Sequence, residues 1–195
     1  AGTTSLVLGT SSGIHAWHND YYIRRLRVGK NEAIYKYLIN NNPELVKDEY
    51  FRPHDTAVIE IPQASPKGSI LRTESAFDLM ERVKLVANDW VKPGHRTGSN
   101  THNVSATISL KKEEWDKAGE WMWKNRDCYN GLSVLPYDGG TYTQAPFEDI
   151  TKKKFEELAK LLHDVNLENV IEVTDETDLS GELACAGGSC EITSL

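Results

Sequence analysis

The chain has 195 residues, of which 39% are hydrophobic and 26% charged, a composition typical of globular proteins rather than of disordered or collagen-like chains. It contains no apolar run of about 18 residues, the length a membrane-spanning helix needs, and no basic-then-apolar export signal. We therefore expect a cytoplasmic protein with no membrane partner. The formal net charge of −7 offers no general attraction for nucleic acid, so we expect no nucleic-acid partner either.

The net negative charge of the chain arises near its C-terminal end. No lysine or arginine follows Lys160, whereas eight acidic residues do, and the preceding part of the chain is nearly neutral. An acidic stretch of this kind is typical of a solvated tail. We therefore expect a folded domain over residues 1–163 and an acidic tail over residues 164–195.

The first part of the chain is expected to alternate between helices and strands. The predicted elements are a helix that follows Gly2 to Ser5 within the apolar stretch 5–14, strands over 21–28 and 56–62, and helices over 31–41 and 74–91. Ile23, Leu26 and Val28 are the expected core residues of the first strand. The long helix carries an apolar face that ends at Trp90.

The second part continues this alternation. The predicted elements are a strand over 102–110, a helix over 112–124, a short strand over 132–135, a helix over 151–163 and a weak strand over 170–173. Trp115 and Leu162 are expected to face the core from their helices. The predicted strands alternate with helices of roughly 12 to 18 residues. This alternation indicates βαβ units, so we expect an α/β fold with a parallel sheet or barrel.

The opening segment Gly2-Thr3-Thr4-Ser5 leads into a predicted helix. Backbone N–H groups at a helix start, together with hydroxyl groups, form a natural anion site. An ordinary helix cap uses the same residue types, so the spacing alone leaves both interpretations open.

The three cysteines are Cys128, Cys185 and Cys190. Four small residues separate Cys185 from Cys190, and the two glycines among them allow the chain to curl into disulfide geometry. A small loop of this kind is easily formed and easily reduced, which indicates a redox pair. Two incidental thiols or half of a zinc site are the alternatives, and because no second cysteine pair exists we predict no metal site. For Cys128 we expect a buried, inert thiol.

Two further motifs are weaker. His15 and His18 form a His-x-x-His pair, which we expect to bond the backbone or line a groove rather than to bind a metal. The segment from Pro136 to Tyr142, PYDGGTY, is expected to form a tight turn with aromatic residues within a turn-rich loop over 136–146.

Three segments together resemble a known family. Residues 1–29, AGTTSLVLGTSSGIHAWHNDYYIRRLRVG, resemble the phosphate-loop region of ribonucleotide reductase large chains. Residues 131–150, GLSVLPYDGGTYTQAPFEDI, are similar to the monomeric adenosylcobalamin-dependent (class II) ribonucleoside-triphosphate reductases. Residues 182–192, ELACAGGSCEI, resemble the C-terminal redox tail of the family. The resemblance covers essentially the whole chain.

The resemblance implies a fold and specific roles. The chain would form the C-terminal part of the family's ten-stranded α/β barrel, followed by a flexible redox tail. The residues that would hold the substrate's phosphates are Gly2, Thr3, Thr4 and Ser5. Cys185 and Cys190 would re-reduce the active-site disulfide after each turnover, and thioredoxin or a similar dithiol would reduce them in turn.

The resemblance also implies radical chemistry on a ribonucleoside triphosphate, with adenosylcobalamin as cofactor. In the family, homolysis of the cofactor generates a thiyl radical on a central cysteine, and two further cysteines supply the reducing equivalents. Those cysteines lie upstream in the family, and none is present here. We therefore expect a fragment or split subunit that is inactive without an N-terminal reductase portion, and we assign no cobalamin contacts. The alternatives are a class I large-chain fragment, a stand-alone dithiol redox protein and a phosphate-binding module.

Overall fold

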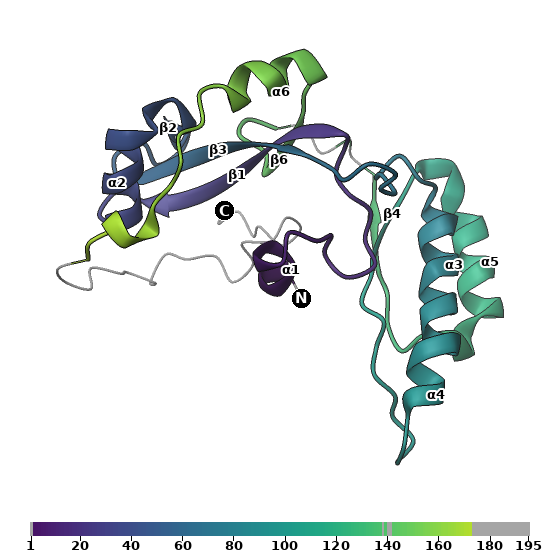
Figure 1. Cartoon of the computed structure of the whole chain (residues 1–195). Coiled ribbons are helices and arrows are strands. Elements are labelled where there is room, and N and C mark those ends of the chain that lie inside the picture. The colour runs from purple at the N-terminus through teal and green to yellow at the C-terminus, as the bar shows by residue number, and fades with distance from the viewer. Residues whose placement is uncertain (1, 138, 140–141, 173–195) are drawn as a thin grey trace. The chain divides into compact units, whose positions relative to one another are not determined.

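The computed structural model describes residues 2–137, 139 and 142–172 (Figure 1). The chain divides into two compact units, each assembled from separate stretches of sequence. Unit 1 contains residues up to Trp17 together with Gly68–Gly140, and unit 2 contains His18–Lys67 together with the residues from Thr141 onward. Cys185 and Cys190, and the expected tail beyond residue 172, lie outside the described residues.

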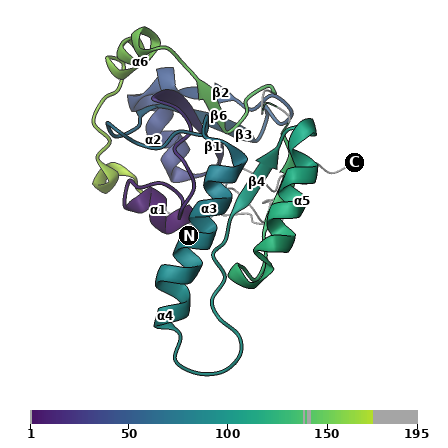
Figure 2. The same ribbon diagram turned by 90° about the vertical axis from the view of Figure 1, so that its right-hand side faces the viewer.

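Unit 1 is built from two helices that pack against a pair of parallel strands. Its elements are α1 (Gly2–Val7), α3 (Ala76–Val86), a π-helical segment (Ala87–Val91), α4 (Lys92–Gly94), β4 (Thr107–Leu110), α5 (Trp115–Lys124) and β5 (Ser133–Pro136). β4 pairs with β5 in parallel, in the register Ile108 to Val134. Figure 2 shows α3 and α5 beside β4.

The core of unit 1 is apolar. Met80 and Val83 of α3 and Ile108 of β4 are fully buried, and Ala118 of α5 is nearly so. α3 begins with a capping box, in which the Ser75 hydroxyl accepts from the Asp78 N–H while the Asp78 carboxylate accepts from the Ser75 N–H. The strands connected through α5 are therefore parallel, as the βαβ pattern predicts.

Unit 2 is built around a four-stranded sheet in the order β2-β3-β1-β6, and every pair in it is antiparallel. Its elements are β1 (Tyr21–Gly29), α2 (Ala33–Asn41), β2 (Val46–Asp48), β3 (Thr56–Ala64), β6 (Phe147–Asp149) and α6 (Lys152–Ala159). The expectation of a parallel sheet is wrong for this unit. Although α2 lies between β1 and β3, the chain reverses through β2 and β3 returns antiparallel to β1.

Strand β1 shows how the sheet divides its two faces. Val28 packs with Leu38 of α2 and with Ala57 and Ile59 of β3 in the apolar core of unit 2. Leu26 was expected in the core and is instead 36% exposed. Ile23 is buried, but a strand turns alternate residues to opposite faces, so Ile23 and Val28 cannot share one core face.

Other differences from expectation have local causes. Trp90 is 78% exposed, because the π-helical segment inserts extra backbone into the turn and Val91 packs against the core in its place. Trp115 and Leu162 are 42% and 39% exposed, against the expectation that they face the core. The apolar stretch 5–14 forms a helix only as far as Val7. No strand forms over residues 170–172, and residue 173 lies outside the described part.

The α/β class is confirmed, whereas the ten-stranded barrel stays a prediction. No described helix is both long and apolar enough to cross a membrane.

Candidate functional site

The predicted phosphate segment lies inside α1 rather than ahead of it. Gly2 to Ser5 form most of this helix, so the expectation that they precede the helix is wrong. Ser5 is buried and Thr4 is exposed. The first turn of any helix leaves backbone N–H groups without partners inside the helix, and such groups bind anions. Phosphate binding by this segment stays a prediction.

The chain that follows α1 is tied to the rest of unit 1 by His15. The His15 ring nitrogen Nδ1 lies 2.8 Å from the Ser12 carbonyl oxygen, and Nε2 lies 3.1 Å from the Thr107 backbone nitrogen. A carbonyl only accepts and a backbone N–H only donates. The ring is therefore neutral with its proton on Nδ1, and it bridges the α1 segment to the first residue of β4.

A second anchor holds the same segment to α3. The Arg82 guanidinium donates to the Ile14 carbonyl oxygen at 3.0 Å and forms an ion pair with Glu74, whose carboxylate it meets at 2.5 and 3.1 Å. The hydrogen bond to Glu74 outweighs the effect of burial and raises the pKa of Arg82. Residues 12–15 are thus held by the hydrogen bond from Arg82, whose ion pair with Glu74 is partly buried, and by the imidazole bridge.

The two histidines of the His-x-x-His pair serve separate units. His15 bonds the backbone, as expected, whereas His18 in unit 2 lies 3.0 Å from an Asp149 carboxylate oxygen and stacks on Phe147. Within the part of the chain that the structure describes, no three histidine, cysteine, aspartate or glutamate side chains gather as they would around a metal ion.

The His15 imidazole is not available as a ligand for the cobalt of adenosylcobalamin. His15 is the imidazole closest in sequence to the α1 segment, and both of its ring nitrogens are occupied by backbone partners. It therefore has no free nitrogen for a metal such as cobalt.

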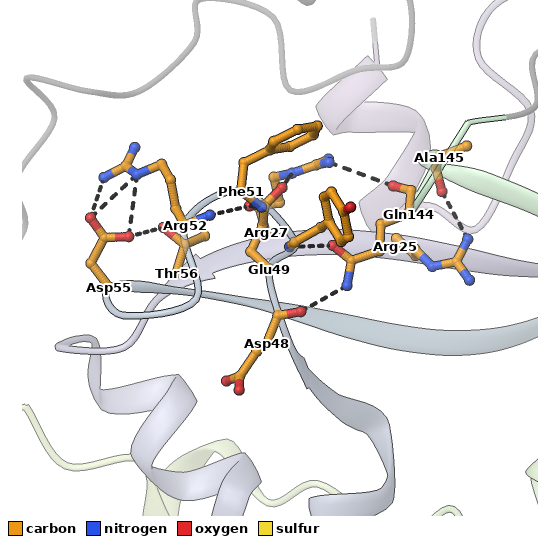
Figure 3. Close-up of polar contacts among 11 residues, drawn as sticks. Arg25, Arg27, Asp48, Glu49, Phe51, Arg52, Asp55, Thr56, Gln144 and Ala145 are labelled. Carbon is orange, nitrogen blue, oxygen red and sulfur yellow. Dashed lines mark hydrogen bonds and ion pairs between the residues drawn. The ribbon is translucent and has the colours of Figure 1, made fainter.

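The QAPFED segment, Gln144 to Asp149, is fixed onto the sheet of unit 2 by Arg25 (Figure 3). Arg25 of β1 donates to the Ala145 carbonyl oxygen at 3.1 Å and to Glu60 of β3 at 2.7 Å, and it pairs with Glu148 of β6. Its side chain is only 9% exposed. Burial opposes the charge of Arg25, but the hydrogen bonds to Glu148 and Glu60 outweigh burial and raise its pKa.

Gln144 joins the same segment to the loop between β2 and β3 (Figure 3). Its side-chain amide donates to the Asp48 carbonyl oxygen and accepts from the Tyr50 N–H, both at 2.8 Å. Its backbone has a φ of 55°, a left-handed conformation that non-glycine residues rarely adopt. The two hydrogen bonds hold it there.

The loop between β2 and β3 is itself organised by Glu49, a carboxylate with 5% exposure. Glu49 accepts from the backbone N–H groups of Phe51 and Arg52 at 2.6 and 2.7 Å and pairs with Arg27 at 3.5 Å. At the loop end, the hydrogen bond from Arg52, followed by that from Thr56, lowers the pKa of Asp55 to about 2.

These contacts give the QAPFED segment a structural role in unit 2. The contacts drawn from Gln144, Ala145 and Glu148 build the sheet and its loop rather than an open binding surface. Sequence reasoning did not identify Arg25 as their partner, because the two lie about 120 residues apart.

Cys128 lines a small cavity in unit 1. The cavity has a volume of about 30 Å³, which is room for a water molecule, and Ala87, Val91 and His102 contribute to its wall. The Asn88 amide nitrogen lies 3.9 Å from the Cys128 sulfur. The thiol is partly buried, less fully than expected.

Comparison with known proteins first defines a structural class. No protein-family model matches the chain. The crystal structure of a B12-dependent (class II) ribonucleotide reductase superposes with a TM-score of 0.68 over 87% of this chain and 23% of that chain, at 23% identity. The chain thus has an α/β fold found in that reductase structure.

Sequence comparison then gives particular relatives. The adenosylcobalamin-dependent ribonucleoside-triphosphate reductase of Euglena gracilis is 29% identical over 196 residues, covering 97% of this chain and 25% of the relative. That of Lactobacillus acidophilus is 27% identical over 195 residues, covering 98% and 25%. The predicted resemblance to these reductases is confirmed. The chain spans about a quarter of the length of the curated relatives it matches.

Proposed function

We propose that this chain contributes to an adenosylcobalamin-dependent ribonucleotide reductase that converts ribonucleoside triphosphates into deoxyribonucleotides. The observation that carries the proposal is similarity over 97–98% of the chain to relatives that share this one name. Because these relatives are adenosylcobalamin-dependent by name, the similarity favours this reductase over a class I large chain.

In this proposal unit 1 provides the substrate's phosphate site. The backbone N–H groups at the start of α1 and the hydroxyls of Thr3, Thr4 and Ser5 would bind the phosphates. His15 and Arg82 support the proposal, because they fix the chain immediately after α1 to β4 and α3. Residues 1–163 would form the C-terminal part of the catalytic barrel.

The remaining part of the proposal concerns residues 164–195. Cys185 and Cys190 would act as a dithiol shuttle: they give up two electrons and two protons, form a disulfide, and reduce the active-site disulfide to two thiols. Thioredoxin or a similar dithiol would then reduce the shuttle in the cytoplasm. Adenosylcobalamin, bound with the help of an N-terminal reductase portion, would supply the radical that starts the reaction.

The proposal is tested by combining this chain with the remaining portion of the reductase polypeptide. Deoxyribonucleotide formation is measured with a ribonucleoside triphosphate, adenosylcobalamin and a dithiol, and each component is omitted in turn. Activity that needs both polypeptides and the cofactor supports the proposal. A well-formed complex without activity contradicts it.

The dithiol role has its own matched controls. Cys185→Ser should abolish turnover driven by thioredoxin, whereas Cys128→Ser should leave it within about twofold, because Cys128 is a partly buried thiol on the wall of a small cavity in unit 1. A small dithiol that reaches the active site directly should restore turnover to Cys185→Ser. Equal losses in both variants would contradict the assignment.

A further inference from the structure

The three arginines on β1 differ in their ion pairing. Arg25 and Arg27 lie on one face of the sheet, and both are paired, with Glu60 and Glu49 respectively. Arg24 lies on the opposite face, since strand residues alternate, and its neighbours in register are Ile61 of β3 and Phe147 of β6.

Arg24 has no anionic partner among the residues that the structure describes. Its guanidinium carbon lies 5.5 Å from the centre of the Phe147 ring, and none of the described residues forms an ion pair or hydrogen bond with it. Its side chain is partly buried. Burial lowers the pKa of Arg24, and a favourable interaction with Tyr22 offsets this only in part.

An arrangement of this kind is costly unless a ligand completes it. A guanidinium stays charged at any physiological pH, and a partly desolvated charge without a partner is unfavourable. Carboxylates among the described residues pair with other arginines, namely Arg25, Arg27, Arg52 and Arg82. None of the described carboxylates is the partner of Arg24, so its guanidinium is open to an anionic ligand.

The support under Arg24 is well fixed. His18 stacks on Phe147 with ring centroids 4.9 Å apart, and Tyr22 packs against the same ring at 5.9 Å. His18 is held in turn by Asp149. The forked donors of a guanidinium held against an aromatic ring suit the several oxygens of a phosphate group.

We propose that Arg24, supported by Phe147, is the anchoring cation of an oxyanion subsite on unit 2, and that its ligand is the phosphate group of a small molecule. Every residue named in this subsite belongs to unit 2, whereas the α1 segment belongs to unit 1. The proposal does not depend on reductase activity.

The test uses inorganic pyrophosphate at low ionic strength and follows the ring resonances of Phe147 and Tyr22 by NMR. Pyrophosphate should shift these resonances in the unmodified chain, and Arg24→Gln should weaken the effect at least about tenfold. Arg96→Gln is the matched control, because Arg96 is exposed in unit 1 and its replacement removes the same charge. No shift, or the same affinity in Arg24→Gln, overturns the proposal.

Two further arms make the result unambiguous. Acetate at matched ionic strength should bind much more weakly, and equal binding would overturn the assignment to phosphate. The melting temperature of Arg24→Gln without ligand should equal or exceed that of the unmodified chain, because an unpaired charge is removed. Should Arg24→Gln fail to fold, Arg24→Lys replaces it in the test, because lysine keeps the charge but lacks the forked donors of the guanidinium. It should still bind pyrophosphate, with affinity below that of the unmodified chain.

Discussion

Unit 1 and unit 2 are stabilised in different ways. Nine buried apolar residues form a single core cluster in unit 1, on α3, the π-helical segment, α5, β4 and the segment before β4. Unit 2 buries ten apolar residues, but only six of them form one cluster, and it adds a network of arginine–carboxylate pairs centred on Arg25 and Glu49. Apolar burial is non-directional, whereas ion pairs and hydrogen bonds require exact partners. Substitutions in unit 1 should therefore change stability mainly through lost side-chain volume, and those in unit 2 mainly through lost ion pairs and hydrogen bonds.

The chain offers a direct means of observing the two units separately. All five tryptophans belong to unit 1, at positions 17, 90, 115, 121 and 123. Tryptophan fluorescence therefore reports unfolding of unit 1, while amide hydrogen exchange on β1 and β3 reports unit 2.

The largest effect is expected for Ile108→Ala in unit 1. Ile108 is fully buried between α3 and α5, so its truncation should lower the free energy of unfolding by about 2–5 kcal/mol. Urea unfolding followed by tryptophan fluorescence measures it. Leu135→Ala on the neighbouring strand is the control, and because Leu135 is 41% exposed its cost should stay below about 1.5 kcal/mol. Equal losses would contradict a volume-dependent core.

In unit 2 the next effect is expected for Arg25→Met. The change leaves the partly buried Glu60 carboxylate without its partner and should cost about 2–3 kcal/mol. Hydrogen exchange of β1 and β3 amides measures the loss. Arg24→Met, one residue away on the other face, removes a cation that has no carboxylate partner and should cost nothing. A comparable loss in both variants would show that pairing does not distinguish these arginines.

A smaller effect is expected for His15→Leu. This change removes the hydrogen bonds of the ring with Ser12 and Thr107, of which the second joins the segment after α1 to β4. It should cost about 1–2 kcal/mol of unfolding free energy in unit 1. In the reconstituted reductase it should also raise KM for the triphosphate more than it lowers kcat. The control is His54→Leu, since the His54 side chain is 78% exposed. An unchanged KM would show that His15 does not position the phosphate segment.

The smallest effect concerns the pH dependence of unit 2. The pKa of Asp55 is lowered from 3.8 to about 2, so its contribution to stability is present above about pH 4 and is lost as the pH falls toward 2. Arg52→Gln should return the pKa of Asp55 toward 3.8 and flatten the pH dependence in that window. An NMR titration of the Asp55 carboxyl group measures the shift. A pKa that stays near 2 in Arg52→Gln would assign it to Thr56 instead.

The sequence predicted the longer elements because their hydrophobic periodicity is strong. β1, α2, β3, α3, α5 and α6 all lie within the predicted ranges or extend them by at most two residues. β2 and β6 were missed, since each has three residues and its side chains include charges. Such short strands exist only because β3 and β1 offer them a free edge.

The candidate sites were less predictable, because their geometry depends on distant partners. The bridge from His15 to Thr107 and the pairing of Arg25 with Glu148 join residues about 90 and 120 positions apart, which periodicity cannot relate. Periodicity also assumes a regular helix, so the π-helical segment that exposes Trp90 could not be anticipated. The family resemblance did mark QAPFED, although as a pattern without its structural reason.

The most direct test of the proposed function counts product in the absence of added reductant. The reductase reconstituted from this chain and its remaining portion is reduced, freed of dithiol, and mixed with adenosylcobalamin and a ribonucleoside triphosphate. Each product consumes one dithiol, so about two deoxyribonucleotides should form per reductase, one from the active-site pair and one from Cys185 and Cys190. Cys185→Ser should form about one. No cobalamin-dependent product, or equal yields from both proteins, would contradict the account.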